Sequence, residues 1–316
     1  MNGLQKSMIT GYVLAISGGI FWAVGGSCGQ YLFQHNQMTS NWLVPIRLTA
    51  AGILLLTFAT VRQQNIFEIW TSKQNVADIL VFGLIGSALC QYSYYTSIQY
   101  SNVALATVLA YTSPIMILFY TVVKEKRPPK LYETVCVLLV MVGAFVCSTH
   151  LNIGSLVIHP LALIWGLLSA ATFVVYTIQP QRLLRQLDLM VVIGWGMLLG
   201  GIALMVLFQP WQIDVTVNST LLFCMAIIVV LGTVCSFCFY QAGVGIVGSI
   251  TGNILSSVEP VASMIISVLF LNVPLTGLDF LGFALILICI PIMALGNGKE
   301  LRKKWSENKK DLQQIN

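Results

Sequence analysis

Long apolar runs without a charged residue dominate the chain. A helix needs ~20 apolar residues to cross the hydrocarbon core of a bilayer. Counted in units of that length, the runs predict ten transmembrane helices over residues 11–33, 42–61, 76–98, 102–123, 132–149, 159–178, 189–208, 219–241, 247–271 and 277–296. The runs are continuous instead of alternating, which favours helices over a membrane β-barrel. The pattern therefore predicts an all-α polytopic membrane protein.

The overall composition agrees with this prediction. Of 316 residues, 57% are hydrophobic and only 9% are charged, whereas a soluble domain carries about 25% charged residues. This excludes a soluble globular enzyme, a disordered chain, a coiled coil and a nucleic-acid binder. The expected location is a cell membrane, most simply a bacterial plasma membrane. The expected partners are the lipid bilayer and a small-molecule substrate, with no nucleic acid.

The basic residues are confined to alternate connections between the predicted helices. Every Lys and Arg except Arg47 falls in the set of loops that includes both termini, and the opposite loops hold none. Cytoplasmic loops of membrane proteins carry the excess of Lys and Arg. We therefore predict that both termini are cytoplasmic and that the number of crossings is even. The basic tail fits a topology determinant, and it could also contact anionic lipid.

The two halves of the chain share a spacing pattern. Tyr94 precedes Pro114 by 20 residues, and Tyr240 precedes Pro260 by the same number, which gives an offset of 146. Each half then holds five predicted helices. Because five is odd, the second half must enter the membrane from the opposite side, and inverted repeats of this kind are typical of transporters with a midplane site between the halves. The predicted units are a first five-helix repeat over 11–149, a second over 154–296 and a basic cytoplasmic tail over 297–316.

Several short motifs carry a family resemblance. They are Gly18-Gly19-Ile20-Phe21-Trp22, Pro45-Ile46-Arg47, Tyr95-Thr96-Ser97-Ile98-Gln99-Tyr100 leading to Ser113-Pro114, and a second copy in Tyr240-Gln241-Ala242 leading to Val258-Glu259-Pro260. Together with the helix count and the repeat, they resemble EamA-type members of the drug/metabolite transporter superfamily. The resemblance covers residues 11–296. It implies a ten-helix secondary transporter for amino acids, amines, other metabolites or drugs, often working outward.

Two charged residues lie at depth in the predicted helices, Arg47 and Glu259. Charges inside a membrane are expensive and usually face a cavity or a partner. Arg47 sits about one turn into its helix, so it either reaches the outer interface, with a structural ion pair or a carbonyl cap, or takes part in ion coupling. Glu259 precedes Pro260, which leaves the Ser256 carbonyl without its helix partner. Glu259 is a candidate proton or cation site, or a partner for a substrate ammonium group; the alternative is a silent carboxyl bound to helix backbone.

Aromatic and polar residues at intermediate depth complete the candidate site. Aromatic rings bind organic cations through cation–π contact, although any single ring can equally be plain core packing. Asn253 and Ser256 lie close to Glu259 and give its helix the densest polar patch of any span. The candidate substrate-binding residues are Trp22, Tyr95, Tyr111, Trp165, Tyr176, Tyr240, Asn253 and Ser256.

No motif of a membrane enzyme is present. The sequence contains no HExxH, no pair of neighbouring aspartates for Mg²⁺, no GxSxG and no P-loop. The CxxC formed by Cys235 and Cys238 has no histidine nearby, so neither a metal nor a cofactor is expected. We predict a secondary transporter that exports a small metabolite such as an amino acid or amine by alternating access. The alternatives are a drug efflux carrier and, with weaker support, a channel.

Overall fold

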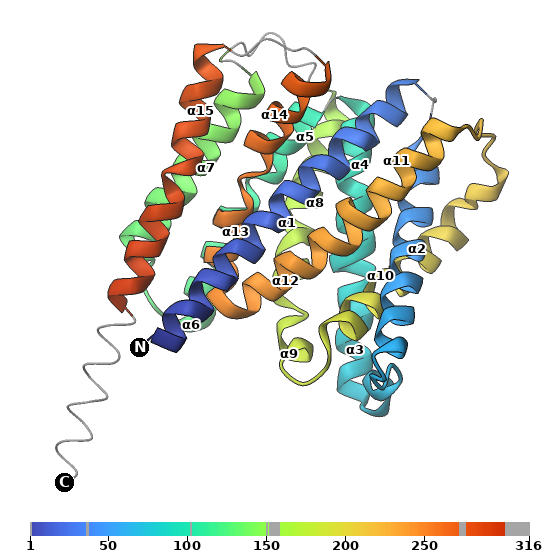
Figure 1. The fold of residues 1–316 in the computed structure, drawn as a ribbon, viewed down its shortest axis with the longest axis horizontal. Helices are drawn as coiled ribbons and strands as arrows, with labels where there is room; N and C mark the ends of the chain where they lie inside the picture. Colours follow the sequence, from blue (N-terminus) through green and yellow to red (C-terminus); the bar gives the residue numbers. More distant parts are fainter. Residues whose placement is uncertain are drawn as a thin grey trace.

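The computed structural model describes residues 2–35, 38–101, 103–149, 151, 159–271 and 276–300. All regular structure within these ranges is helical, which confirms the predicted all-α class (Figure 1). In this part of the chain, eight helices are long and apolar enough to cross a membrane, and Leu131–Cys147 forms a shorter apolar helix. The count of ten crossings stays a prediction.

The helices follow one another along the chain in two sets of similar order. The first half contains α1 (Asn2–His35), α2 (Ser40–Val61), α3 (Lys73–Val81), α4 (Cys90–Tyr100), α5 (Val103–Ala110), α6 (Ser113–Glu125) and α7 (Leu131–Thr149). The second half contains α8 (Pro160–Ile178), α9 (Gln181–Leu184), α10 (Leu189–Phe208), α11 (Ser219–Val229), α12 (Ser236–Val247), α13 (Ser249–Ser256), α14 (Glu259–Leu271) and α15 (Gly277–Leu287). Two short 3₁₀ turns, Glu68–Thr71 and Pro210–Gln212, lie in connections.

Two of the predicted spans are each interrupted by a turn. Tyr111 and Thr112 form the turn between α5 and α6, and Ser257 and Val258 form the one between α13 and α14. Pro114 and Pro260 follow these turns; a proline ring cannot continue the helix that precedes it. The two turns lie 146 residues apart, the offset found between the halves of the sequence. Tyr111 of the first turn, and Ser256 and Glu259 on either side of the second, line the central cavity described below.

Two π-helical segments also occur at matching positions. They are η2 (Phe82–Leu89), which joins α3 to α4, and η5 (Val230–Cys235), which joins α11 to α12. In the second, the Thr233 hydroxyl donates to the carbonyl of Ile228, five residues earlier, at 2.7 Å. Such bulges are frequent at functional sites. Both segments adjoin the central pocket described below.

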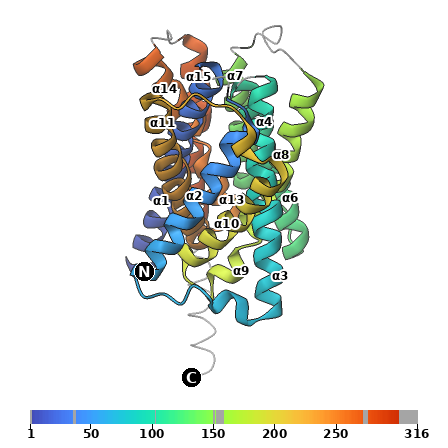
Figure 2. The ribbon, with the colours of Figure 1, turned by 90° about the vertical axis from the view of Figure 1, so that its right-hand side faces the viewer.

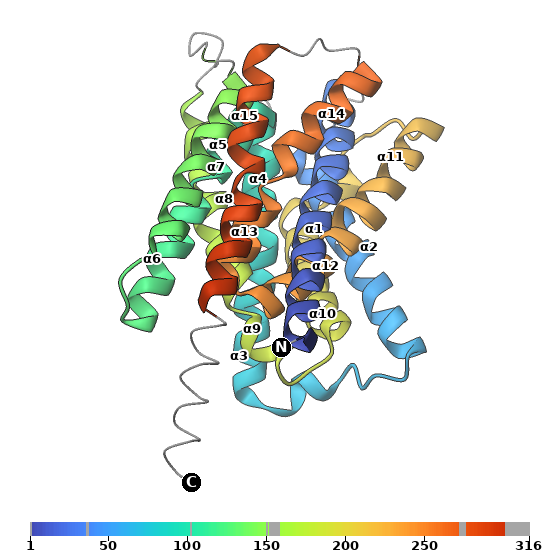
Figure 3. The same ribbon diagram turned by 60° about the vertical axis from the view of Figure 1, so that its left-hand side comes forward.

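The two halves of the chain interlock. The most extensive helix contacts are α1 with α12, α2 with α10, α4 with α8 and α7 with α15, and each of them joins one half to the other. Figure 1 shows α1 crossing α12, and Figures 2 and 3 show α7 beside α15 from two further sides. The protein core therefore lies between the halves, and neither half packs as a separate bundle.

The two ends of the described chain meet at one end of the bundle. The Asn297 side-chain amide donates to the Tyr12 hydroxyl at 3.0 Å, and that hydroxyl lies 3.3 Å from the Met293 carbonyl oxygen. Figure 1 shows the start of α1 and the end of the last helix on the same side. This placement agrees with an even number of crossings, which is what the charge pattern requires.

A glycine pair sets the closest approach between α1 and the π segment η5. A Cβ atom on Gly25 would lie 2.6 Å from the Cα of Gly232, whereas one on the neighbouring Gly26 would meet nothing within 4 Å. We expect Gly25→Ala to lower the thermal stability of the purified protein, since overpacking costs about 1–3 kcal/mol. Gly26→Ala is the matched control and should not lower it. Equal melting temperatures for the two variants would contradict this close contact.

Candidate functional site

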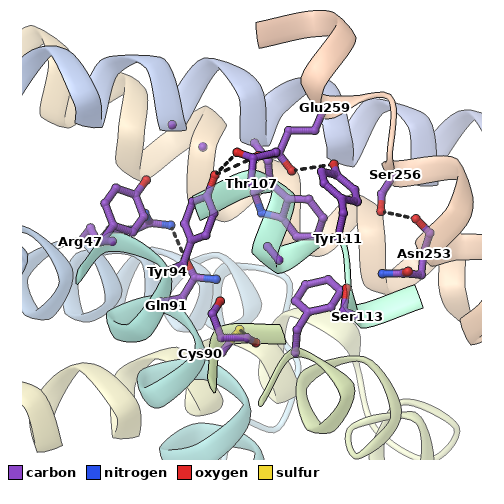
Figure 4. Close-up of a pocket in the computed structure, with 17 residues that line it drawn as sticks. Arg47, Cys90, Gln91, Tyr94, Thr107, Tyr111, Ser113, Asn253, Ser256 and Glu259 are labelled. Carbon is purple, nitrogen blue, oxygen red and sulfur yellow. Dashed lines mark hydrogen bonds between the residues drawn. The ribbon is translucent and has the colours of Figure 1, made fainter. Parts of the chain in front are cut away.

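A small cavity of about 80 Å³ lies at the centre of the bundle, where helices of both halves converge (Figure 4). By the same measure a single water needs ~10–15 Å³, so the cavity holds a small ligand head group. We call it the central pocket. It is lined by Trp22, Gly26, Arg47, Cys90, Gln91, Tyr94, Tyr95, Thr107, Ala110, Tyr111, Ser113, Ser169, Phe173, Gly232, Asn253, Ser256 and Glu259.

The carboxyl of Glu259 is held by two phenols. The Tyr94 hydroxyl lies 3.5 Å from one carboxyl oxygen and the Tyr111 hydroxyl lies 3.3 Å from the other, each oriented as a donor (Figure 4). These distances exceed the usual 2.5–3.0 Å, so the carboxyl is only loosely satisfied. None of the ion pairs found among the described residues includes Glu259. It therefore faces the pocket with capacity to accept a further hydrogen bond or a cation.

The backbone explains why Glu259 can occupy this place. Glu259 begins α14 directly after the turn, and Pro260 takes the next position. The first N–H groups of a helix have no intrahelical partner and favour a negative charge beside them. At the equivalent turn of the first half, Ser113 precedes Pro114 and also lines the pocket. The two interrupted helices thus bring their turns to the same cavity.

Arg47 is almost fully buried, with 1% of its surface exposed. One terminal nitrogen donates to the Gln91 side-chain oxygen at 3.2 Å, and the guanidinium carbon lies 4.7 Å from the centre of the Tyr95 ring. The Nε atom and the other terminal nitrogen have no hydrogen-bond partner. The interpretation in which Arg47 reaches the outer interface is therefore wrong. Its side chain turns into the protein and lines the central pocket.

An aromatic cluster forms one wall of the pocket. The Trp22 ring lies 4.8 Å from Tyr240, 5.3 Å from Phe237 and 5.8 Å from Phe173, measured between centroids. Trp22 and Phe173 line the cavity, whereas Tyr240 is fully buried behind them. The wall is therefore backed by packed rings, which fixes the orientation of Trp22.

The structure brings most of the predicted site residues together. The pocket-lining ones are Trp22, Arg47, Tyr95, Tyr111, Asn253, Ser256 and Glu259. Three others do not line the pocket, and their binding role stays a prediction. Tyr176 and Tyr240 lie in the packed layer behind it, where the Tyr240 hydroxyl bonds to Thr177 at 2.9 Å. Trp165 lies edge-on against Tyr92 at 5.4 Å.

Sequence reasoning missed several lining residues, of which Tyr94 and Thr107 matter most. The two hydroxyls lie 3.2 Å apart, and Tyr94 also reaches Glu259. Tyr94 was visible in the sequence only as a marker of the repeat, since it matches Tyr240 at the offset of 146. Thr107 lies four residues before Tyr111 and therefore on the same helix face. That spacing was the available signal.

A second, larger hollow of about 980 Å³ opens at the end of the bundle that carries the basic loops. We call it the basic vestibule. Arg127 pairs with Glu133 at 2.9 Å in its wall, and Arg182 pairs with Asp78 across the two halves. Thr251 of α13 lines the vestibule, whereas Asn253 of the same helix lines the central pocket. One helix therefore borders both spaces.

Apolar helices of membrane length around a buried, charged pocket define a polytopic membrane protein of the transporter class. The model of the EamA-like transporter family matches residues 9–149 and again residues 160–295. The chain therefore belongs to the EamA-like transporter family and is a multi-pass membrane transporter. This confirms the resemblance drawn from the sequence motifs.

Two comparisons with individual proteins agree with this assignment. The chain is 32% identical over 302 residues to the “Uncharacterized inner membrane transporter YicL” of Salmonella typhimurium, covering 96% of this chain and 99% of that protein. A solved chain described as “Crystal structure of protein” matches with a TM-score of 0.73 at 16% identity, covering 90% of this chain and 96% of the other. The second similarity shows the fold alone.

Proposed function

We propose that this protein is a secondary transporter that exports a small metabolite, such as an amino acid or an amine, by alternating access around the central pocket. The single observation that carries the proposal is the pocket itself, where Glu259, Arg47 and Trp22 converge from different helices. Charged groups buried among membrane-length helices are expensive and mark substrate or ion pathways. The substrate passes through chemically unchanged, so no catalysed reaction is part of the proposal.

We further propose that residues 11–149 and 154–296 form two inverted five-helix repeats, with ten crossings in total. The paired turns at Tyr111 and Ser257, the paired π segments and the four inter-half helix contacts support this arrangement. In transporters of this design the substrate site lies at the repeat interface and one half rocks against the other. The basic vestibule is the access route from the cytoplasmic side.

The volume of the pocket favours a small metabolite over a drug. A cavity of about 80 Å³ takes a small head group, whereas drug-sized ligands occupy pockets of ~300–1,000 Å³. An efflux carrier for drugs would therefore need a much larger opening of the same helices. The amino acid or amine stays the primary proposal.

Uptake into proteoliposomes tests the transport proposal. Candidate substrates are first ranked by thermal stabilisation of the purified protein, since a ligand at 100 times its Kd adds ~2.7 kcal/mol to the stability of the folded state. The initial rate of uptake of the best ligand should saturate with concentration. Single-channel conductance in a planar bilayer, with uptake that never saturates, would contradict a carrier.

Reporter fusions test the proposed orientation. Tags placed after Asn316 and within residues 152–155 should report the cytoplasm and the opposite side, respectively, because the basic loops lie at one end and are retained inside. Residues 152–158 lie outside the described part of the structure. A C-terminal tag that reports the outside, or a central tag that reports the inside, would refute the proposed ten-crossing topology.

A further inference from the structure

The central pocket contains an unsatisfied positive charge. Arg47 is 1% exposed, and two of its three guanidinium nitrogens have no hydrogen-bond partner. Its contacts are a neutral amide oxygen of Gln91 and the face of the Tyr95 ring. No ion pair among the described residues includes Arg47. A buried cation without a counter-ion is costly in free energy. The two unpartnered nitrogens can donate to the two oxygens of a carboxylate, as in a bidentate arginine–carboxylate pair.

The opposite wall of the same pocket has the complementary character. Glu259 accepts two long hydrogen bonds from tyrosines, and the Asn253 side-chain oxygen has no partner at all. Both are acceptors that suit an ammonium group. Arg47 and Glu259 do not pair with each other; adjacent residues Tyr94 and Tyr95 of α4 stand between them, the first bonded to Glu259 and the second stacked on Arg47. The pocket therefore keeps a basic and an acidic side chain apart, and neither has an ion-pair partner among the described residues.

We propose that Arg47 is an anion-binding subsite and that the Glu259 wall is a cation-binding subsite, so that the transported substrate is a zwitterion with a carboxylate and an amine. This inference rests on the proposed transport function and specifies the class of substrate. A simple amine would satisfy Glu259 and leave Arg47 buried without a counter-charge, close to a second cation. A simple carboxylic acid would leave Glu259 in the same position. Only a zwitterion places a carboxylate against Arg47 and an amine against Glu259 in one molecule. A ligand that lacks either group leaves Arg47 or Glu259 unpaired and therefore binds more weakly.

Equilibrium binding to the purified protein tests the proposal with ligands matched in size. The probes are norleucine and 6-aminohexanoate, which are isomeric zwitterions, with pentylamine as the amine and hexanoate as the acid. Phenylalanine, phenethylamine and 3-phenylpropionate form a second set. We expect calorimetry to show that, in at least one set, a zwitterion binds with a Kd about ten- to a hundred-fold lower than the amine or the acid. This difference corresponds to the free energy of one hydrogen bond to a buried charged group.

Two variants assign the subsites. Arg47→Gln should remove the preference for the zwitterion over the amine while amine binding persists, and Glu259→Gln should remove the preference over the acid. Arg47→Lys keeps the positive charge but lacks the planar guanidinium group, so it should retain a reduced preference for the zwitterion over the amine. Arg62→Gln removes an exposed basic residue that lines neither the central pocket nor the vestibule and is the control that should leave every ligand ratio unchanged. A structural role for Arg47 would weaken all ligands alike and leave the ratios intact.

The possible results separate this inference from the transport proposal. An amine that binds the wild-type protein as tightly as the zwitterions overturns the zwitterion inference, and so does the absence of binding by every zwitterion. Unchanged ligand ratios in Arg47→Gln also overturn it. These results leave a carrier for amines intact. Failure of the transport proposal is a different result: a ligand that binds with the predicted preference and is not taken up in a saturable manner.

Discussion

Replacing Glu259 with glutamine is expected to abolish pH-driven accumulation of substrate. The carboxyl faces the pocket without a basic partner, and the adjacent turn at Ser257 and Val258 leaves its helix interrupted. A carboxyl in that position can carry a proton across with the substrate or hold the substrate amine. Glutamine keeps the shape and removes the charge. A proton-coupled carrier should lose the driven accumulation and retain substrate exchange, whereas an amine-binding carboxyl should lose affinity for the substrate.

Glu68→Gln is the control for this experiment. Glu68 is exposed and lines neither the central pocket nor the basic vestibule, so the variant removes a carboxylate outside both spaces. We expect it to transport like the wild-type protein in proteoliposomes with an imposed pH gradient. If Glu259→Gln also leaves rate, affinity and pH dependence unchanged, Glu259 is a structural hydrogen-bonding group and the coupling hypothesis fails.

Removing an aromatic ring from the pocket gives the second large expected effect. Trp22→Ala and Tyr111→Ala should each lower transport at subsaturating substrate by an amount typical of cation–π contact, ~0.5–2 kcal/mol or about two- to thirty-fold. Trp22 forms a wall of the pocket, and Tyr111 both lines it and bonds to Glu259. The initial rate of uptake, divided by the amount of protein in the membrane, is the measurement.

Trp165→Ala is the matched control for the ring variants. Trp165 was an equal candidate from the sequence, but it packs against Tyr92 and does not line the pocket. We expect its loss to affect stability more than transport. Normal uptake in both pocket variants, with reduced uptake in Trp165→Ala, would place the substrate site elsewhere in the bundle.

The sequence predicted the fold class because charge-free runs of membrane length have one physical solution. A bilayer leaves every backbone polar group to be satisfied within the segment, and only a helix does so. The positions at which turns interrupt the helices were harder to predict from the sequence. Pro260 indicated a weakened helix, but the sequence alone does not distinguish a kink from the turn at Ser257 and Val258. The π segments Phe82–Leu89 and Val230–Cys235 were not predicted from the sequence.

The sequence predicted which charged and aromatic residues belong to the candidate site, but it did not predict how they are arranged in space. Arg47 and Glu259 stood out because charges are rare at membrane depth. Their convergence on one cavity depends on tertiary packing of two helices far apart in the chain. For the same reason Tyr94, whose hydroxyl reaches Glu259, had no distinguishing mark beyond its place in the repeat. Tyr176 resembled a pocket residue by depth, yet it packs behind the wall with none of its surface exposed.

Counterflow in proteoliposomes tests alternating access at the central pocket most directly. Vesicles are loaded with unlabelled substrate, using the ligand that binds tightest, and diluted into a trace of the same compound in labelled form. A carrier that exposes one pocket to each side in turn exchanges the two, so we expect the label to rise above its equilibrium level and then decline. This overshoot should shrink in Trp22→Ala. A label that rises smoothly to equilibrium without an overshoot would contradict the account.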